Sequence, residues 1–284
     1  MKQSIRLSLI GLISFLASIF GKKNRIRIKQ LVSSALNLGN ISDETVSFAN
    51  GKKAIFHCPN DLTRWRVETI FEKEPETLEW IDGFEKDDVL WDIGANMGLY
   101  TVYAATHGTR VLAFEPSAAN FYVLNLSIFK SNLSNIATAY CLAFTDIEST
   151  SELMMQNFDF GGALSSFGTT IGYDGKKFTP KIKQGMIGYS IDGYISSFNP
   201  LFPNHIKIDV DGIEDKIISG GRNTLLDSRL RSISIELDAE RPEYTNAVVE
   251  QIVDKGFKLQ SKRHAAMFDN SLFARNFNYQ FSRI

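Results

Sequence analysis

The segment from Val89 to Pro116 constrains the fold of this chain more than any other part of the sequence. It opens with a short apolar run that ends at Gly94, continues through a loop into a helix expected over 99–106, and returns in a second apolar run over 110–114. A short apolar run bounded by turn residues is typical of a buried strand. Strand, loop, helix and strand in this order predict a βαβ unit with two parallel strands.

The rest of the chain repeats this alternation. Further strands are expected over 136–144, 151–155, 206–210, 232–237, 257–260 and 271–275, and helices over 62–84, 117–131, 213–219 and 244–255. Residues 157–189 are expected to form loops or a hairpin. Alternating strands and helices of this length predict an α/β fold with a doubly wound, mostly parallel sheet. In such sheets a ligand binds outside the carboxyl ends of the strands.

The N-terminal part differs in composition from the rest of the chain. Residues 1–53 hold nine basic and two acidic residues, a formal charge of +7, although the whole chain carries −1. An apolar run over 5–20 precedes a basic cluster over 22–29, and its 16 residues are fewer than the roughly 20 that cross a bilayer. We therefore expect a mainly helical, basic extension over 1–60 and a main domain over 61–284.

Three interpretations of residues 5–29 stay open. The segment is a helix packed on the main domain, a membrane-surface helix whose basic cluster contacts anionic lipid, or a secretory signal, for which no clean cleavage site follows. The two cysteines, Cys58 and Cys141, form no CxxC pair, which suits a reducing cytosol and argues against a structural zinc site. We expect a cytoplasmic protein, with the inner face of a membrane as the alternative location.

Two acidic residues and a glycine bend mark the carboxyl ends of the first two strands. Asp92 comes just before Gly94, and Glu115 ends the second strand 23 residues after Asp92. An acid at that second position accepts hydrogen bonds from ribose hydroxyls. The loop from Gly94 to Gly98 lacks the G-x-G-x-x-G spacing that admits a pyrophosphate, and Asp92 would repel phosphate but attract an ammonium group. The pattern therefore favours S-adenosylmethionine over NAD.

Between about residues 85 and 240 the chain resembles the FkbM-type methyltransferases, a branch of the class I S-adenosylmethionine-dependent enzymes. The matching stretches are VLWDIGANMGLYTVYAA, VLAFEPSAANFYVLNLSI, LAFTDIESTSELMM, GGALSSFG and HIKIDVDGIEDKIISGGRNTLL. The resemblance implies a seven-stranded sheet whose last strand is antiparallel, and methyl transfer to a hydroxyl of a sugar, glycolipid or natural product. By position, it assigns the cosubstrate loop to Asp92, Gly94, Asn96 and Gly98, the ribose to Glu115, and the surroundings of the adenine to Ala143.

The strand expected over 206–210 supplies the candidate catalytic residues. Alternation along this strand places Lys207, Asp209 and Asp211 on one face. A hydroxyl needs an acceptor for its proton before it becomes a good nucleophile, so Asp209 is the first candidate for a base or for orienting the acceptor, and Asp211 and Lys207 are secondary. Alternatively, Asp209 caps the next helix or binds a cation with Asp211. Two carboxylates alone do not specify a metal, and no metal site is predicted.

Other segments have less definite expected roles. Glu236 either lines the cleft or is solvated, the loop 161–166 either approaches the acceptor or is a surface turn, and residues 64–66 either gate the acceptor or pack a helix. A small molecule or a glycan is the expected acceptor, because an acidic body without a basic stripe argues against nucleic acid. Two other functions stay open: a nicotinamide-dependent oxidoreductase, and a non-catalytic, membrane-recruited scaffold with a vestigial cofactor pocket.

Overall fold

The computed structural model describes residues 42–271 and 273–284. The segment 5–29 and the expected helix within it lie outside these residues. The described part of the extension is a hairpin of two antiparallel strands, β1 (Ser42–Ser47) and β2 (Lys53–Cys58), and not a helix. Phe56 of β2 is fully buried in the core of the main domain, and the backbone N–H groups of Ile55 and His57 donate to serine hydroxyls. The hairpin is therefore continuous with the main domain.

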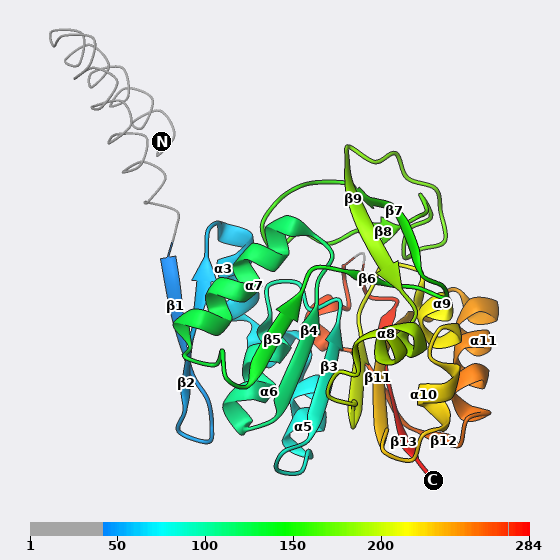
Figure 1. The fold of residues 1–284 in the computed structure, drawn as a ribbon. Coiled ribbons are helices and arrows are strands. Elements are labelled where there is room, and N and C mark those ends of the chain that lie inside the picture. Colours follow the sequence, from blue (N-terminus) through cyan, green and yellow to red (C-terminus); the bar gives the residue numbers. More distant parts are fainter. Residues whose placement is uncertain (1–41, 272) are drawn as a thin grey trace, which may run out of the picture.

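A seven-stranded sheet forms the centre of the molecule (Figure 1). In chain order its strands are β3 (Val89–Ile93), β4 (Arg110–Phe114), β5 (Ala137–Tyr140), β10 (His205–Ile208), β11 (Ser232–Asp238), β12 (Phe257–Arg263) and β13 (Asn276–Arg283). Across the sheet the order is β12-β13-β11-β10-β3-β4-β5. Strand β13 runs antiparallel to the other six strands, which all run in the same direction. The expected α/β class, the parallel sheet and the antiparallel last strand are confirmed.

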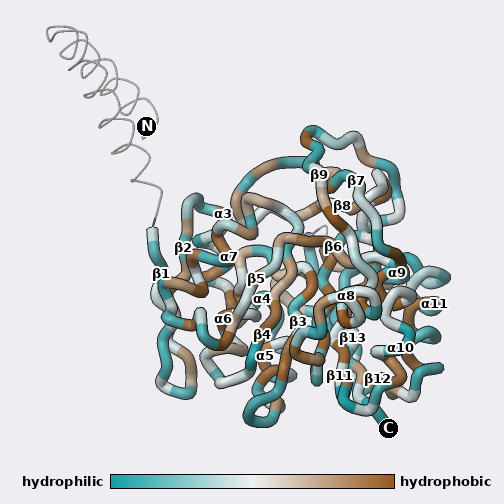
Figure 2. The backbone as a smooth tube through the Cα atoms, in the orientation of Figure 1, coloured by the Kyte–Doolittle hydropathy of each residue, from teal (hydrophilic) through white to brown (hydrophobic). Residues whose placement is uncertain are grey.

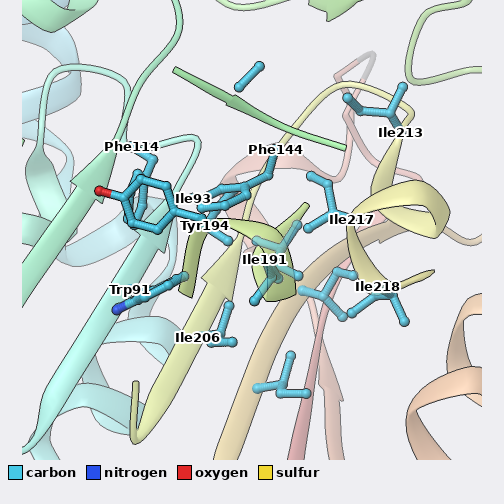
Figure 3. Packing of buried hydrophobic residues seen from close by; sticks show 14 of the residues in the cluster. Trp91, Ile93, Phe114, Phe144, Ile191, Tyr194, Ile206, Ile213, Ile217 and Ile218 are labelled. Atoms are coloured by element: carbon cyan, nitrogen blue, oxygen red, sulfur yellow. The ribbon is translucent and has the colours of Figure 1, made fainter. Parts of the chain in front are cut away.

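Helices cover both faces of this sheet. One face carries α3 (Asp61–Glu68), α4 (Ile70–Lys73), α5 (Pro75–Asp82), α6 (Leu99–His107) and α7 (Ala118–Lys130); the other carries α8 (Ile191–Phe198), α9 (Glu214–Ser219), α10 (Arg222–Leu226) and α11 (Pro242–Val253). Successive strand residues point to opposite faces of the sheet. Leu90 therefore packs in the hydrophobic core under α3–α7, and Trp91 packs in the core under α8–α11. Figure 3 shows Trp91, Phe114 and Phe144 gathered around Tyr194 of α8. Figure 2 shows the central strands as the most continuously hydrophobic part of the backbone.

A second, smaller sheet lies above the carboxyl ends of the parallel strands (Figure 1). It contains β6 (Ala143–Phe144), β7 (Ser149–Met155), β8 (Ser165–Phe167) and β9 (Ile182–Tyr189), in the order β6-β9-β7-β8. The single strand expected over 136–144 is therefore wrong, because the chain leaves the central sheet after Tyr140 and β6 pairs with β9 instead. The strand expected over 151–155 exists, but it belongs to this second sheet.

Three further expectations need correction. The helix expected over 62–84 is three short helices, because the backbone is non-helical at Thr69 and again at Glu74, which precedes Pro75 at the start of α5. The strand expected over 271–275 is wrong: residues 273–275 form a turn, and the closing strand β13 follows it. Strand β10 ends at Ile208, two residues earlier than expected. Within the described residues, no helix is long and apolar enough to cross a membrane.

Candidate active site

A cavity opens at the carboxyl ends of the central strands. The strand order sets the sequence of groups along it: Glu115 follows β4, the loop from Gly94 follows β3, Asp209 follows β10, and Glu236 lies in β11. Three strand spacings separate the first of these groups from the last, which is roughly 14 Å. Leu142, Ala143 and Phe144 line the cavity with Glu115, and Asn276 and Asn278 line it with Glu236. The cavity is thus long enough to have two chemically distinct ends.

Glu115 is held as a hydrogen-bond acceptor at one end of the cavity. Its Oε2 accepts from the backbone N–H of Asn96 and its Oε1 from that of Ser117, both at 2.8 Å. Burial raises the pKa of this carboxyl to about 7, and the two backbone donors oppose that rise. Each carboxylate oxygen has a further lone pair beyond the one that these bonds use. The position suits the pair of hydroxyls on a ribose.

The loop between β3 and α6 is shaped by its neighbours. Gly94 has a φ of 83°, and a Cβ there would overlap the backbone carbonyl of Asp209. Asn96, at a φ of 50°, turns its Nδ2 to the carbonyl of Gly162 at 2.8 Å. Gly98, at a φ of 89°, precedes α6, and a Cβ there would overlap the side chain of Leu124. Gly94, Asn96 and the predicted adenine neighbour Ala143 line the cavity, whereas Gly98 does not.

Asp92 does not line the cavity. Alternation points its side chain to the α6 face of the sheet, where Oδ2 accepts from Thr101 Oγ1 at 2.6 Å and the residue is 1% exposed. Burial raises the pKa of this carboxyl. The sequence interpretation placed Asp92 beside an ammonium group, but the structure places it behind the loop, where it anchors the start of α6.

The three candidate catalytic residues occupy different environments. Asp209 lines the cavity, and its Oδ2 accepts from Lys207 Nζ at 2.8 Å. Lys207 is 2% exposed and lies behind Asp209, outside the cavity lining. Asp211 lines the cavity, but its Oδ2 accepts from the backbone N–H of Ser165 at 2.9 Å, which fixes the start of β8. Burial raises the pKa of Asp211 to about 6. The alternation argument thus holds for Lys207 and Asp209, whereas Asp211 has turned toward the small sheet.

Several cavity residues lay in segments where the sequence offered no motif. Glu74 and Glu76 come from the junction of α4 and α5, and Asn276 and Asn278 come from β13. Asn278 Nδ2 donates to Glu76 Oε1 at 2.8 Å, and Asn276 Nδ2 donates to Glu236 Oε1 at 2.8 Å. A buried acid next to a helix-starting proline looks like an ordinary first-turn acid in a sequence. No local signal distinguishes these residues.

The fold and this site define a class of enzyme. A doubly wound sheet with one antiparallel strand at the end of the chain, an acid at the tip of β4 and a loop without the pyrophosphate spacing are the features of an S-adenosylmethionine-dependent methyltransferase of class I. The donor set fits that cosubstrate, because Glu115 offers acceptors to a ribose, and Asp209 and Asp211 favour a cationic sulfonium over a phosphate.

Comparison with known proteins places the chain within a family. The methyltransferase FkbM domain matches residues 92–259, more than half of the chain, and the chain belongs to this family. S-Adenosylmethionine is therefore its methyl donor, and this assignment replaces the nicotinamide-dependent alternative.

Individual relatives are distant. The hexuronic acid methyltransferase AglP of Haloferax volcanii is 24% identical over 217 residues, which cover 76% of this chain and 84% of that protein. Among solved structures, magnesium protoporphyrin IX methyltransferase (ChlM) from Synechocystis PCC 6803 with bound SAM is 11% identical, with a TM-score of 0.46 over 79% of this chain and 85% of that one. Precorrin-6y C5,15-methyltransferase from Geobacter metallireducens is 13% identical, with a TM-score of 0.43 over 74% and 86%.

Proposed function

We propose that this protein methylates a hydroxyl oxygen of a sugar-type small molecule. The observation that supports this most is Asp209, a carboxylate that lines the cavity between the ribose-binding end and a polar far end. The far end offers both donors and acceptors, in Glu236, Asn276 and Asn278, as a molecule with several hydroxyls requires. Trp65 adds an aromatic surface at the rim, where it is 39% exposed. The resemblance to a hexuronic acid methyltransferase supports a sugar acceptor.

Asp209 is the proposed general base. Bound S-adenosylmethionine supplies an electrophilic methyl group on a sulfonium. Lys207 donates a hydrogen bond to Oδ2 of Asp209, which leaves Oδ1 to accept the proton of the acceptor's hydroxyl group. Because the buried ammonium of Lys207 fixes the orientation of the carboxylate, little reorganisation is needed when the hydroxyl binds.

Glu236 is the proposed donor to the acceptor molecule. Burial, followed by the nearby charges of Asp209 and Glu74, raises the pKa of this carboxyl to about 8. At neutral pH it is therefore mostly protonated, and its O–H can donate to a second oxygen of the acceptor while Asp209 accepts from the first. Two carboxyl groups with opposite protonation states are a common arrangement for distinct roles at one site.

The experiment is a methylation assay with a panel of hexuronic acid glycosides and neutral hexose glycosides. Mass spectrometry follows both the S-adenosylhomocysteine formed and the gain of one methyl group, and NMR locates that methyl group. We expect a new O-methyl signal on at least one glycoside. Asp209→Asn should lose about 10²- to 10⁴-fold in rate, as expected for removal of a general base.

Asp87→Asn is the matched control, because Asp87 is exposed near the start of β3, at the other end of the sheet. It should keep the wild-type rate. A methyl group found on nitrogen or carbon would overturn the proposal. Cosubstrate binding without turnover on any glycoside would instead support the non-catalytic scaffold.

A further inference from the structure

Arg66 of α3 lines the cavity, and the proposed reaction does not use it. Its Nε donates to the carbonyl of Gly161 at 2.8 Å. Across residues 42–271 and 273–284, its two Nη nitrogens have neither a hydrogen-bond acceptor nor an ion-pair partner. Since a guanidinium has five N–H donors in a planar fork, the half-buried Arg66 is held by one donor and presents the fork to the cavity.

The other basic residues of the cavity wall are already engaged. Lys73 Nζ lies 2.6 Å from Glu74 Oε1. His264 Nε2 lies 2.8 Å from Asp269 Oδ1, and its Nδ1 faces the carbonyl of Asn276. Among the described residues that line the cavity, Arg66 is thus the cation without a carboxylate in hydrogen-bond or ion-pair contact, although its charge acts at longer range to lower the pKa of Asp211, against the larger effect of burial. An anionic group of a ligand is the natural partner for such a fork.

Hydrogen bonds connect Arg66 to the cosubstrate end of the cavity. From the carbonyl of Gly161, the chain continues to Gly162, whose carbonyl accepts from Asn96 Nδ2 at 2.8 Å and Asn120 Nδ2 at 2.9 Å. The backbone N–H of Asn96 in turn donates to Glu115. Arg66 therefore shares one network with the ribose-binding acid.

The polar groups proposed for the acceptor belong to other contacts. Glu236 accepts a hydrogen bond from Asn276, and Glu76 accepts one from Asn278. The loop over 161–162 is hydrogen-bonded to Asn96, and the loop that contains Asn96 leads into α6, whose N-terminal end favours negative charge. Position and electrostatics both favour an anion next to the loop after β3.

We infer that Arg66 binds the carboxylate of the amino acid part of S-adenosylmethionine. This residue lies outside the segment 92–259 that matches the family, so the match does not assign it a role. The inference rests on the methyl donor and is independent of the hydroxyl acceptor proposed above. A bidentate arginine–carboxylate pair would fix the amino acid end of the donor while Glu115 holds its ribose.

Isothermal titration of the full chain with two ligands tests this role. S-Adenosylhomocysteine carries the carboxylate, whereas 5′-methylthioadenosine keeps the nucleoside and the sulfur but lacks the amino acid. Arg66→Gln retains an N–H donor for Gly161 but removes the charge. We expect its affinity for S-adenosylhomocysteine to fall about tenfold or more, while its affinity for 5′-methylthioadenosine stays within about twofold of wild type.

Two further variants complete the test. Arg66→Lys keeps the charge without the fork and should lose less affinity than Arg66→Gln. Arg64→Gln is the matched control, because Arg64 lies on the same helix, pairs with Glu44 and Asp61, and is outside the cavity lining. It should bind both ligands as wild type does.

Three results would overturn the inference. If Arg66→Gln lowered the affinity for both ligands by the same factor, Arg66 would only support the loop at Gly161. Unchanged binding of both ligands would remove any role in the donor site. Unchanged binding together with a higher KM for a glycoside would assign Arg66 to the acceptor. Because the titration contains no acceptor, failure of the O-methylation proposal would leave its outcome unaffected.

Discussion

Lys207 Nζ lies 2.8 Å from Asp209 Oδ2 and 3.9 Å from Glu74 Oε2, with the lysine 2% exposed. Burial alone would lower the pKa of this ammonium, but the carboxylates of Asp209, Glu74 and Asp92 raise it above its ordinary range. Lys207 therefore stays cationic and cannot accept a proton. It positions Asp209, which the proposed mechanism uses as the base.

Removing this buried cation should destabilise the fold. Lys207→Met leaves the carboxylates of Glu74 and Asp209 without their shared partner, which typically costs about 3–5 kcal/mol for a broken buried ion pair. Urea unfolding followed by circular dichroism measures the loss, with Lys86→Met at an exposed position as control. An unchanged midpoint in Lys207→Met would show that the pair contributes nothing to stability.

Binding of S-adenosylhomocysteine should depend on pH through Glu115. Burial raises the pKa of this carboxyl to about 7, and only the ionised form has all its lone pairs available to the ribose hydroxyls. Affinity should therefore weaken as the pH falls below about 7, approaching about tenfold for each unit. Titrations across this range, in wild type and in Glu115→Gln, measure the effect. A wild-type curve as flat as that of Glu115→Gln would contradict the assignment.

Gly94→Ala should lower the free energy of unfolding for two separate reasons. The φ of 83° is strained for alanine, and the added Cβ would overlap the carbonyl of Asp209. Gly51→Ala is a matched control, because Gly51 has a φ of 76° with open space around the position of a Cβ. We expect Gly51→Ala to lose about 1–2 kcal/mol and Gly94→Ala to lose clearly more. Thermal unfolding of both variants checks this, and equal losses would mean that the loop moves away from β10 at little cost.

Stability should respond to pH through Glu236. The pKa of this carboxyl is raised from 4.5 to about 8 in the folded protein, so the folded state holds a proton that the unfolded state releases. Its contribution to stability is thus present below about pH 4.5 and is lost as the pH rises to about 8. Relative to wild type, Glu236→Gln should gain in melting temperature across this window and then level off. A difference that does not vary with pH would argue against a protonated Glu236.

Much of the sheet could be predicted from local patterns. The strands at 89–93, 110–114 and 232–238 appeared within one residue of the expected positions, because the first two are short apolar runs and the third alternates isoleucine with polar residues. Predictions failed where pairing partners decide the structure. One strand was expected over 136–144, yet β5 and β6 belong to different sheets, and β6 pairs with β9, which begins more than 35 residues later in the chain.

Local sequence patterns predicted part of the donor site, but they did not predict the residues on the acceptor side. Glu115, Gly94 and Asn96 stand in one continuous strand–loop–helix–strand unit, so their spacing along the chain translates directly into nearness. Arg66, which is proposed for the donor, and Glu74 and Asn278 toward the acceptor side come from three separate segments of the chain. Their spacing in the chain has no relation to their distances in space.

The sequence by itself determined that a glycine bend and an acid stand at the tips of two adjacent parallel strands, since alternation and turn chemistry act over a few residues. Only the tertiary structure decided which way the carboxylates face. Asp92 and Glu115 both follow apolar runs, yet one is buried against α6 and the other lines the cavity, because the register of each strand and the helix packed on it set the direction of each side chain.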